Sequence, residues 1–207
     1  NHPAPGPSIF PMGEEGAYAF AEAMKFGFAG RGELGDPVVH PQVNPLAEQM
    51  AQDKRMASHS RHNTNWHHTM TPDKYGTQFV GPSNHGTTHM SVMDGQGGAA
   101  ALTTTVNFSF GSGLLAPASG IVLNDQMNDF SVSTKVANGF GLAPSPMNRP
   151  QPGARPLSSM CPTLVLDDGL PYLAVGASGG PTIISSVSAV VIHALQYNAS
   201  AALAVGL

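Results

Sequence analysis

The sequence predicts an α+β protein in which helices come first and strands follow. Three observations support this prediction: helical spacing of apolar residues over 14–29, alternating segments at 88–93 and 100–107 around a glycine-rich turn, and an apolar helix after Pro181. The helical pattern gives way to strands at Thr87. We therefore divide the chain into a helical region, residues 1–86, and a mixed region, residues 87–207.

The helical region opens with a proline-rich lead-in, residues 1–13, followed by two predicted helices. Two acidic residues stand in the first turn of the first helix, where the helix dipole favours them. Its helical spacing is formed by Ala17, Phe20, Ala21, Met24 and Phe28. In the second helix, Asn44 is predicted to be the N-cap and Pro45 the first helical residue, and the helix runs toward Met56.

Residues 57–86 are polar and without clear periodicity, so we predict a long loop that leads to Thr87. Four histidines near Trp66 admit two interpretations, a solvated linker or a zinc or nickel site. They are His59, His62, His67 and His68. We favour the linker, and expect no metal, because no second cluster of acids or cysteines completes a ligand set.

In the mixed region, the strands at 88–93 and 100–107 are joined by the turn at 94–98, so Thr87 starts a strand. Further short strands are predicted at 120–124, 163–166 and 172–175, the last two joined by an Asp-Asp-Gly turn. Pro181 stands in the first turn of a helix that runs to about Tyr197.

Composition limits the classes of function. Only 11% of the 207 residues are charged, and 24 glycines and 18 prolines favour loops and turns, so we expect exposed apolar surface that causes aggregation or needs a partner chain. A net charge of −4 with nine basic residues and no basic run excludes nucleic acid as a partner. No apolar run reaches the ~18–20 residues of a membrane span, and the N terminus lacks the pattern of a signal peptide. The single cysteine, Cys161, excludes an internal disulfide and is predicted to be a small buried residue.

The Gly86-Thr87 peptide bond is the feature from which we predict chemistry. A threonine hydroxyl is a weak nucleophile until a base removes its proton. Cleavage before Thr87 would free an α-amino group, with a reference pKa of roughly 7.7–8.0, on the same residue as the hydroxyl. On turn and strand statistics alone this segment is an ordinary loop entering a strand, so the prediction depends on the blocks that follow.

Five ordered blocks carry a resemblance: TTHMSV at 87–92, TTTVN at 103–107, SGIVLNDQMNDFS at 119–131, RPLSSM at 155–160 and GASGG at 176–180. With AEAMKF at 21–26 and LGDP at 34–37, the chain resembles the γ-glutamyltransferase (γ-glutamyltranspeptidase) family of N-terminal nucleophile hydrolases, which cut themselves before such a threonine. The resemblance implies a partial αββα sandwich, truncated at both ends. It makes residues 1–86 the end of a large subunit and 87–207 a truncated small subunit.

The resemblance also implies roles for individual residues. Thr87 would be nucleophile and base after cleavage at Gly86-Thr87, and Thr105 would hydrogen-bond the nucleophile. The backbone N–H groups of Gly179 and Gly180 would form the oxyanion hole, which agrees with the physics of glycines before a helix. The ammonium of a γ-glutamyl substrate would be held by Asn107, Gln126 and Asp129, and its α-carboxylate by Ser158 and Ser159. A loop over residues 135–156, with Phe140 at its tip, would cover the pocket.

The resemblance implies two departures from the family: a C-terminal segment of the small subunit that helps to complete the sandwich is missing, and so is one binding residue. The carboxylate-binding arginine of the family lies in the part of the large subunit that is missing here, and neither Arg31 nor Arg155 matches it. The glutamyl carboxylate would thereby lose a charge-assisted partner. A complementary large-subunit chain would be one source of that arginine.

Three functions follow as hypotheses. The first is γ-glutamyl transfer from glutathione or a related amide to water or an amino acid, through an ester on Thr87 and without a cofactor. The second is an inactive family member that serves as a structural or partner-binding module. The third is an acylase for glutaryl or cephalosporin amides, which the ammonium-binding set of Asn107, Gln126 and Asp129 disfavours. The resemblance implies an extracellular, periplasmic or membrane-attached location.

Overall fold

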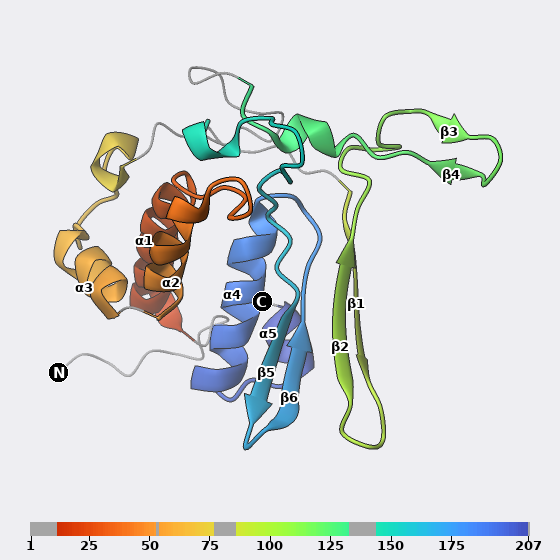
Figure 1. Cartoon of the computed structure of the whole chain (residues 1–207). Helices are drawn as coiled ribbons and strands as arrows, with labels where there is room; N and C mark the ends of the chain where they lie inside the picture. Colours follow the sequence, from red (N-terminus) through yellow and green to blue (C-terminus); the bar gives the residue numbers. More distant parts are fainter. Residues whose placement is uncertain (1–11, 53, 77–85, 133–143, 207) are drawn as a thin grey trace, which may run out of the picture.

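The structure is a computed structural model that describes residues 12–52, 54–76, 86–132 and 144–206. The α+β prediction is confirmed, because helices dominate before Thr87 and antiparallel hairpins follow it (Figure 1). The helices are α1 (Gly13–Arg31), α2 (Asn44–Gln52), α3 (Lys54–Asn63), α4 (Thr182–Gln196) and α5 (Ala201–Gly206). The hairpins pair β1 (Thr88–Met93) with β2 (Ala99–Thr104), β3 (Leu115–Ala116) with β4 (Ile121–Val122), and β5 (Thr163–Asp167) with β6 (Leu170–Val175). Within the described residues, no helix has the length and apolarity to span a membrane.

The first predicted helix is confirmed as α1, whereas the second predicted helix and the loop predicted after it each need one correction. Asn44 has helical angles (φ −57°, ψ −48°) and is the first residue of α2 rather than its N-cap, because a short 3-10 helix, η1 (Pro41–Val43), leads directly into it. Residues 57–63 belong to α3 and not to the predicted loop. Packing explains the difference, since the His59 ring contacts the Phe26 ring edge-on with centroids 5.6 Å apart.

The segment after α3 is tied to α1 by a buried carboxylate. Glu22 is 1% exposed and accepts hydrogen bonds from Lys25 and Thr69, both at 2.6 Å, and from the Tyr75 hydroxyl. The Tyr18 hydroxyl donates to the Asn65 carbonyl at 2.5 Å. The part of the predicted linker that precedes residue 76 is therefore fixed on α1. In the described part of the chain, no three His, Cys, Asp or Glu side chains lie close enough to hold a metal ion.

The hairpin that begins next to Thr87 has the predicted position. Its register runs from Thr88 opposite Thr104 to Met93 opposite Ala99, and the Asp94 carboxylate accepts the N–H groups of the turn. The second strand ends at Thr104 and not at Asn107. The reason is local, because Asn107 adopts a left-handed conformation (φ 77°) that leaves the sheet.

Two hairpins and one helix form packed layers around the site. The loop between β5 and β6 has positive φ at Asp168 and Gly169, as a two-residue turn requires. The β5–β6 hairpin contacts β1–β2 on one side and α4 on the other. A core of Val175, Ile183 and Val187 joins β6 to α4. This arrangement is part of the αββα sandwich that the resemblance implies.

The outer face of the β1–β2 hairpin is apolar and exposed. Met90, Val92 and Leu102 are 55%, 48% and 56% exposed, in agreement with the uncovered apolar surface expected from composition.

The two regions of the chain meet where Leu34 and Asp36 contact residues 145–155. Ser145 Oγ donates to the Leu34 carbonyl at 3.3 Å, and Arg155 binds the buried Asp36 carboxylate through two nitrogens at 2.9 and 3.0 Å. Between them, Gly35 lies so close to Met147 that a Cβ would overlap the Met147 carbonyl oxygen.

Gly35→Ala is therefore expected to destabilise the fold by about 1–3 kcal/mol, the usual cost of overpacking. Gly27→Ala is the matched control: it lies inside α1 with no atom within 4 Å of an added Cβ, and is expected to stabilise the helix by roughly 0.5–1 kcal/mol. Urea midpoints of the two variants check both values. Equal midpoints would show that the two regions do not pack at Gly35.

Candidate active site

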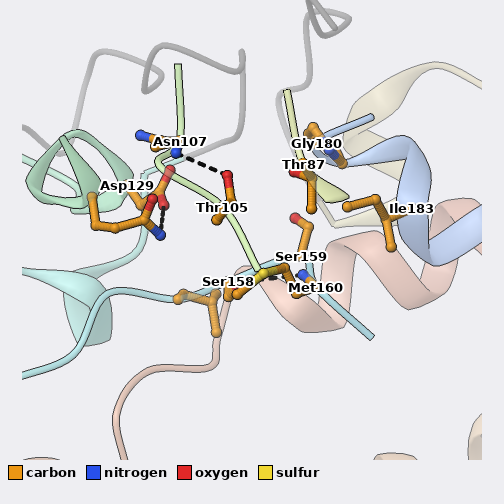
Figure 2. Close-up of a pocket in the computed structure, with 12 residues that line it drawn as sticks. Thr87, Thr105, Asn107, Asp129, Ser158, Ser159, Met160, Gly180 and Ile183 are labelled. Carbon is orange, nitrogen blue, oxygen red and sulfur yellow. Dashed lines mark hydrogen bonds between the residues drawn. The ribbon is translucent and has the colours of Figure 1, made fainter. Parts of the chain in front are cut away.

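One pocket is lined by most of the residues that the sequence singled out (Figure 2). They come from the residue before β1, the residues after β2, the 3-10 helix η3 (Gln126–Asp129), the segment before β5 and the first residues of and before α4. The lining consists of Thr87, Thr105, Asn107, Gln126, Asp129, Leu157, Ser158, Ser159, Met160, Gly180, Pro181 and Ile183. Of the other predicted residues, Gly86 lines an adjacent pocket with Thr87, and Gly179 precedes Gly180 without lining the site.

Thr105 binds the peptide bond that precedes Thr87. Its hydroxyl donates to the Gly86 carbonyl oxygen at 2.9 Å and accepts the Asn107 backbone N–H at 2.8 Å. Successive hydrogen bonds of this kind polarise one another, so the Gly86 carbonyl is made more electrophilic. In the uncut chain, the Thr105 hydroxyl thus donates to the carbonyl before Thr87, whereas the resemblance led us to expect a bond to the Thr87 hydroxyl.

The side of the pocket near η3 is rich in hydrogen-bond acceptors. The Oε1 atom of Gln126 is buried without a partner, while its Nε2 donates to Asp129 Oδ2 at 3.4 Å. Asn107 is 4% exposed and its amide donates to the Asp125 carbonyl at 3.3 Å. An unpartnered buried acceptor beside a buried carboxylate is a favourable environment for a cationic donor.

The carboxyl group of Asp129 has an altered affinity for protons. Burial, assisted by the negative charge of Asp125, raises its pKa to about 6, against the lowering effects of the Arg31 charge and a hydrogen bond from Asn107. This shift means that ionised Asp129 is poorly compensated in the unliganded protein. A bound cation would supply the missing compensation.

Two serine hydroxyls lie on the opposite side, in the extended segment before β5. Ser158 Oγ accepts the Met160 N–H at 3.0 Å, and Ser159 Oγ accepts from Arg31 Nη2 at 3.1 Å. Arg31 is the last residue of α1, and reasoning from the sequence passed over it because it does not match the family arginine. The one local signal is its position at a helix C-terminus, where a cation is favoured.

The turn into α4 requires its glycines. Gly179 and Gly180 have φ of 124° and 58°, conformations that other residues rarely adopt. The Ile183 N–H donates to the Gly180 carbonyl at 3.1 Å, so the helix begins directly after this turn, and Figure 2 shows Gly180 beside Thr87. Backbone N–H groups at such a helix start suit an anion.

Two further predictions concern the surroundings of the pocket. Phe140 and the first part of the predicted covering loop, residues 135–143, lie outside the described residues; the described part contains η4 (Pro146–Asn148) and binds Asp36 through Arg155. Cys161 is partly buried and packs against the core of Val175, Ile183 and Val187, and burial raises the pKa of its thiol.

The packed hairpins, the covering helix α4 and the strand that begins beside Thr87 define the class: this is part of an N-terminal nucleophile hydrolase fold. The chain belongs to the γ-glutamyltranspeptidase family, because the family model of gamma-glutamyltranspeptidase matches residues 8–206. Glutathione hydrolase 2 of Arabidopsis thaliana is 40% identical over 182 residues, which cover 87% of this chain and 31% of that relative. The chain thus spans about a third of the length of this relative.

Two other similar proteins complete the comparison. A relative from Arabidopsis thaliana named "Putative inactive glutathione hydrolase 4" is 37% identical over 161 residues, 77% of this chain and 83% of that protein. Among solved structures, a variant of the γ-glutamyltranspeptidase of Helicobacter pylori superposes with a TM-score of 0.55 at 39% identity, covering 56% of this chain and 63% of the other.

Proposed function

We propose that this chain performs γ-glutamyl transfer and hydrolysis on glutathione or related γ-glutamyl amides, through an acyl-enzyme on Thr87 that forms after autocatalytic cleavage of the Gly86-Thr87 bond. One observation carries the proposal: a single pocket is lined by Thr87, by acceptors suited to an ammonium group and by serine hydroxyls suited to a carboxylate. These are the groups needed to bind the amino-acid end of a γ-glutamyl amide and to attack its amide carbon.

Cleavage begins when Thr87 Oγ attacks the Gly86 carbonyl carbon. The Thr105 hydroxyl, 2.9 Å from the Gly86 oxygen, stabilises the negative charge that develops on that oxygen. The C–N bond then breaks, the nitrogen takes a proton and becomes the Thr87 amine, and Gly86 is left as an ester on Thr87 Oγ. Water hydrolyses the ester to give a Gly86 carboxylate and a free Thr87.

Turnover repeats this chemistry with the substrate. The Thr87 amine accepts the hydroxyl proton while Oγ attacks the γ-carbonyl carbon, and the N–H groups of Gly179 and Gly180 stabilise the oxyanion. The C–N bond of the amide breaks, the departing amine takes the proton, and the γ-glutamyl group stays as an ester on Thr87. Water or an amino acid then attacks the ester and releases the product.

Recognition of the α-ammonium separates this function from that of a glutaryl acylase. A glutaryl group has no ammonium, so it would leave Gln126 Oε1 buried without a donor and the buried Asp129 carboxylate without a cationic partner. Unpaired buried polar groups discriminate strongly against a substrate that lacks the matching group. The acceptor-rich side of the pocket therefore favours γ-glutamyl over glutaryl amides.

A second candidate is an inactive module that binds a complementary large-subunit chain. The exposed apolar face of β1–β2, formed by Met90, Val92 and Leu102, favours it, as does the relative whose name describes it as inactive. The two candidates share a partner, because the large-subunit chain would also supply the family arginine to an active site.

Two measurements on the folded chain decide between them. An active chain is expected to show two fragments by intact mass, separated between Gly86 and Thr87, and to release the chromogenic amine from a γ-glutamyl anilide. Both assays are repeated after addition of a large-subunit chain, which is expected to raise the rate. If the chain keeps the mass of the uncut protein and releases no amine, with or without the large-subunit chain, the inactive module is favoured.

A further inference from the structure

Arg31 contacts Ser159, a residue of the active-site pocket, from the other region of the chain. It is the last residue of α1, yet its Nη2 lies 3.1 Å from Ser159 Oγ, 128 positions away in sequence. Arg31 lines a largely apolar cavity between α1 and α4. Residues 157–160 line both this cavity and the active-site pocket, and they separate the two.

Among the residues that the structure describes, no carboxylate forms an ion pair with Arg31. Within the described ranges, the ion pairs at or below 4.0 Å join Lys25 to Glu22, Lys74 to Asp73 and Arg155 to Asp36. Arg155, the other arginine singled out in the sequence, is therefore already engaged. Burial lowers the pKa of the Arg31 guanidinium to about 10, against the raising effect of the Asp129 charge, so the group stays cationic at neutral pH.

The direction of the hydrogen bond determines what Ser159 can do. A guanidinium has donors only, so Ser159 Oγ must accept, and the hydroxyl hydrogen of Ser159 remains available to another acceptor. Because Ser159 lines the pocket, that acceptor can be a group bound there. A hydroxyl that accepts a charge-assisted bond is polarised and becomes a better donor.

We propose that Arg31 is a positioning residue for substrate binding: it holds Ser159 Oγ so that the hydroxyl donates to the α-carboxylate of the γ-glutamyl group, and it supplies positive charge at that end of the pocket. This inference rests on the proposed function and names the group that compensates the α-carboxylate. Since Arg31 precedes Gly86, this charge would belong to the other chain after cleavage.

A second effect distinguishes this role from a structural one. The Arg31 charge opposes burial and the Asp125 charge in setting the pKa of Asp129, while Asn107 and Gln126 contact the same carboxylate without charge. Removal of the Arg31 charge should therefore move the acid midpoint of substrate binding to higher pH. Loss of packing alone would leave that midpoint in place.

The test compares three variants of the full chain: Arg31→Gln, Arg31→Lys and, as a matched control, Arg61→Gln on the exposed side of α3. Each is assayed with γ-glutamyl-p-nitroanilide and with 4-aminobutyryl-p-nitroanilide, which lacks the α-carboxylate. Arg31→Gln is expected to raise KM for the γ-glutamyl substrate by about tenfold to a hundredfold with little change in kcat. KM for the aminobutyryl substrate should stay within about twofold of the parent value, and Arg61→Gln should match the parent throughout.

Further measurements make each result decisive. Ser159→Ala combined with Arg31→Gln should raise KM by less than the product of the two single effects, because Arg31 acts in part through Ser159. If Arg31→Gln does not fold, Arg31→Lys carries the test, with a KM increase limited to the γ-glutamyl substrate. An unchanged KM, an equal increase for both substrates, or fully additive effects would overturn the role of Arg31 while the parent chain remains active. A parent chain that hydrolyses neither anilide would instead overturn the proposed function, and the carboxylate role with it.

Discussion

Thr87→Ala is expected to leave the chain uncut and to abolish γ-glutamyl turnover. Alanine removes the oxygen that would attack both the Gly86 carbonyl and the substrate, so no ester can form in either reaction. Loss of the nucleophile of a group that acts as a unit typically lowers kcat by roughly 10³-fold or more. The fold should persist, because the β1–β2 register begins at Thr88 and does not depend on the Thr87 side chain.

Two control variants make this experiment specific. Thr87→Ser keeps a hydroxyl and, after cleavage, an α-amine, so it should still produce two fragments at a reduced rate. Thr88→Ala changes the exposed neighbouring side chain and should process like the parent. Intact mass and anilide hydrolysis are measured on all three. Cleavage of Thr87→Ala, or turnover by it, would remove Thr87 from the mechanism.

Local sequence patterns predicted the elements that position Thr87. The alternation after Thr87 and the glycine-rich turn specify the β1–β2 hairpin, and the Asp-Asp-Gly turn specifies β5–β6 through positive φ at Asp168 and Gly169. These features depend on neighbours in the chain, so they can be read from the sequence. The meeting of η3, the serine segment and the α4 turn in one pocket depends on tertiary packing, and only the family resemblance led us to expect it.

The features that the sequence did not predict all depend on contacts between residues that are far apart in the chain. Residues 57–63 are helical because His59 packs on Phe26, a contact that polar composition did not predict. Asn107 ends β2 early because its φ of 77° lets its amide reach the Asp125 carbonyl. Arg31 has no periodic or spacing signal at all, since its partner Ser159 lies in the other region of the chain.

Asp129 is expected to impose an acid limb on the pH profile of kcat/KM, with an apparent pKa of about 6 in the free protein. An ammonium group binds the ionised carboxylate, so each pH unit below that value should lower kcat/KM about tenfold for the γ-glutamyl anilide. Asp125→Asn removes a negative charge that raises the pKa of Asp129, and should move the limb to lower pH. An asparagine at 125 keeps an oxygen that can accept the Phe108 N–H.

Asp129→Asn should remove this limb and raise KM by about tenfold to a hundredfold, while making the protein no less stable. The direction of the stability effect follows from the raised pKa of Asp129. Folding favours the neutral carboxyl group, so the stability due to Asp129 is fully present below pH 3.8 and is lost as pH rises through about 6. A neutral amide avoids that loss, so the urea midpoint of Asp129→Asn should equal or exceed that of the parent at pH 8. Because the substrate ammonium compensates the ionised carboxylate, L-glutamate should raise the midpoint of the parent at pH 8 and not that of the variant. A KM that is constant from pH 5 to 8, or a variant that is less stable than the parent at pH 8, would contradict an ammonium-binding role for Asp129.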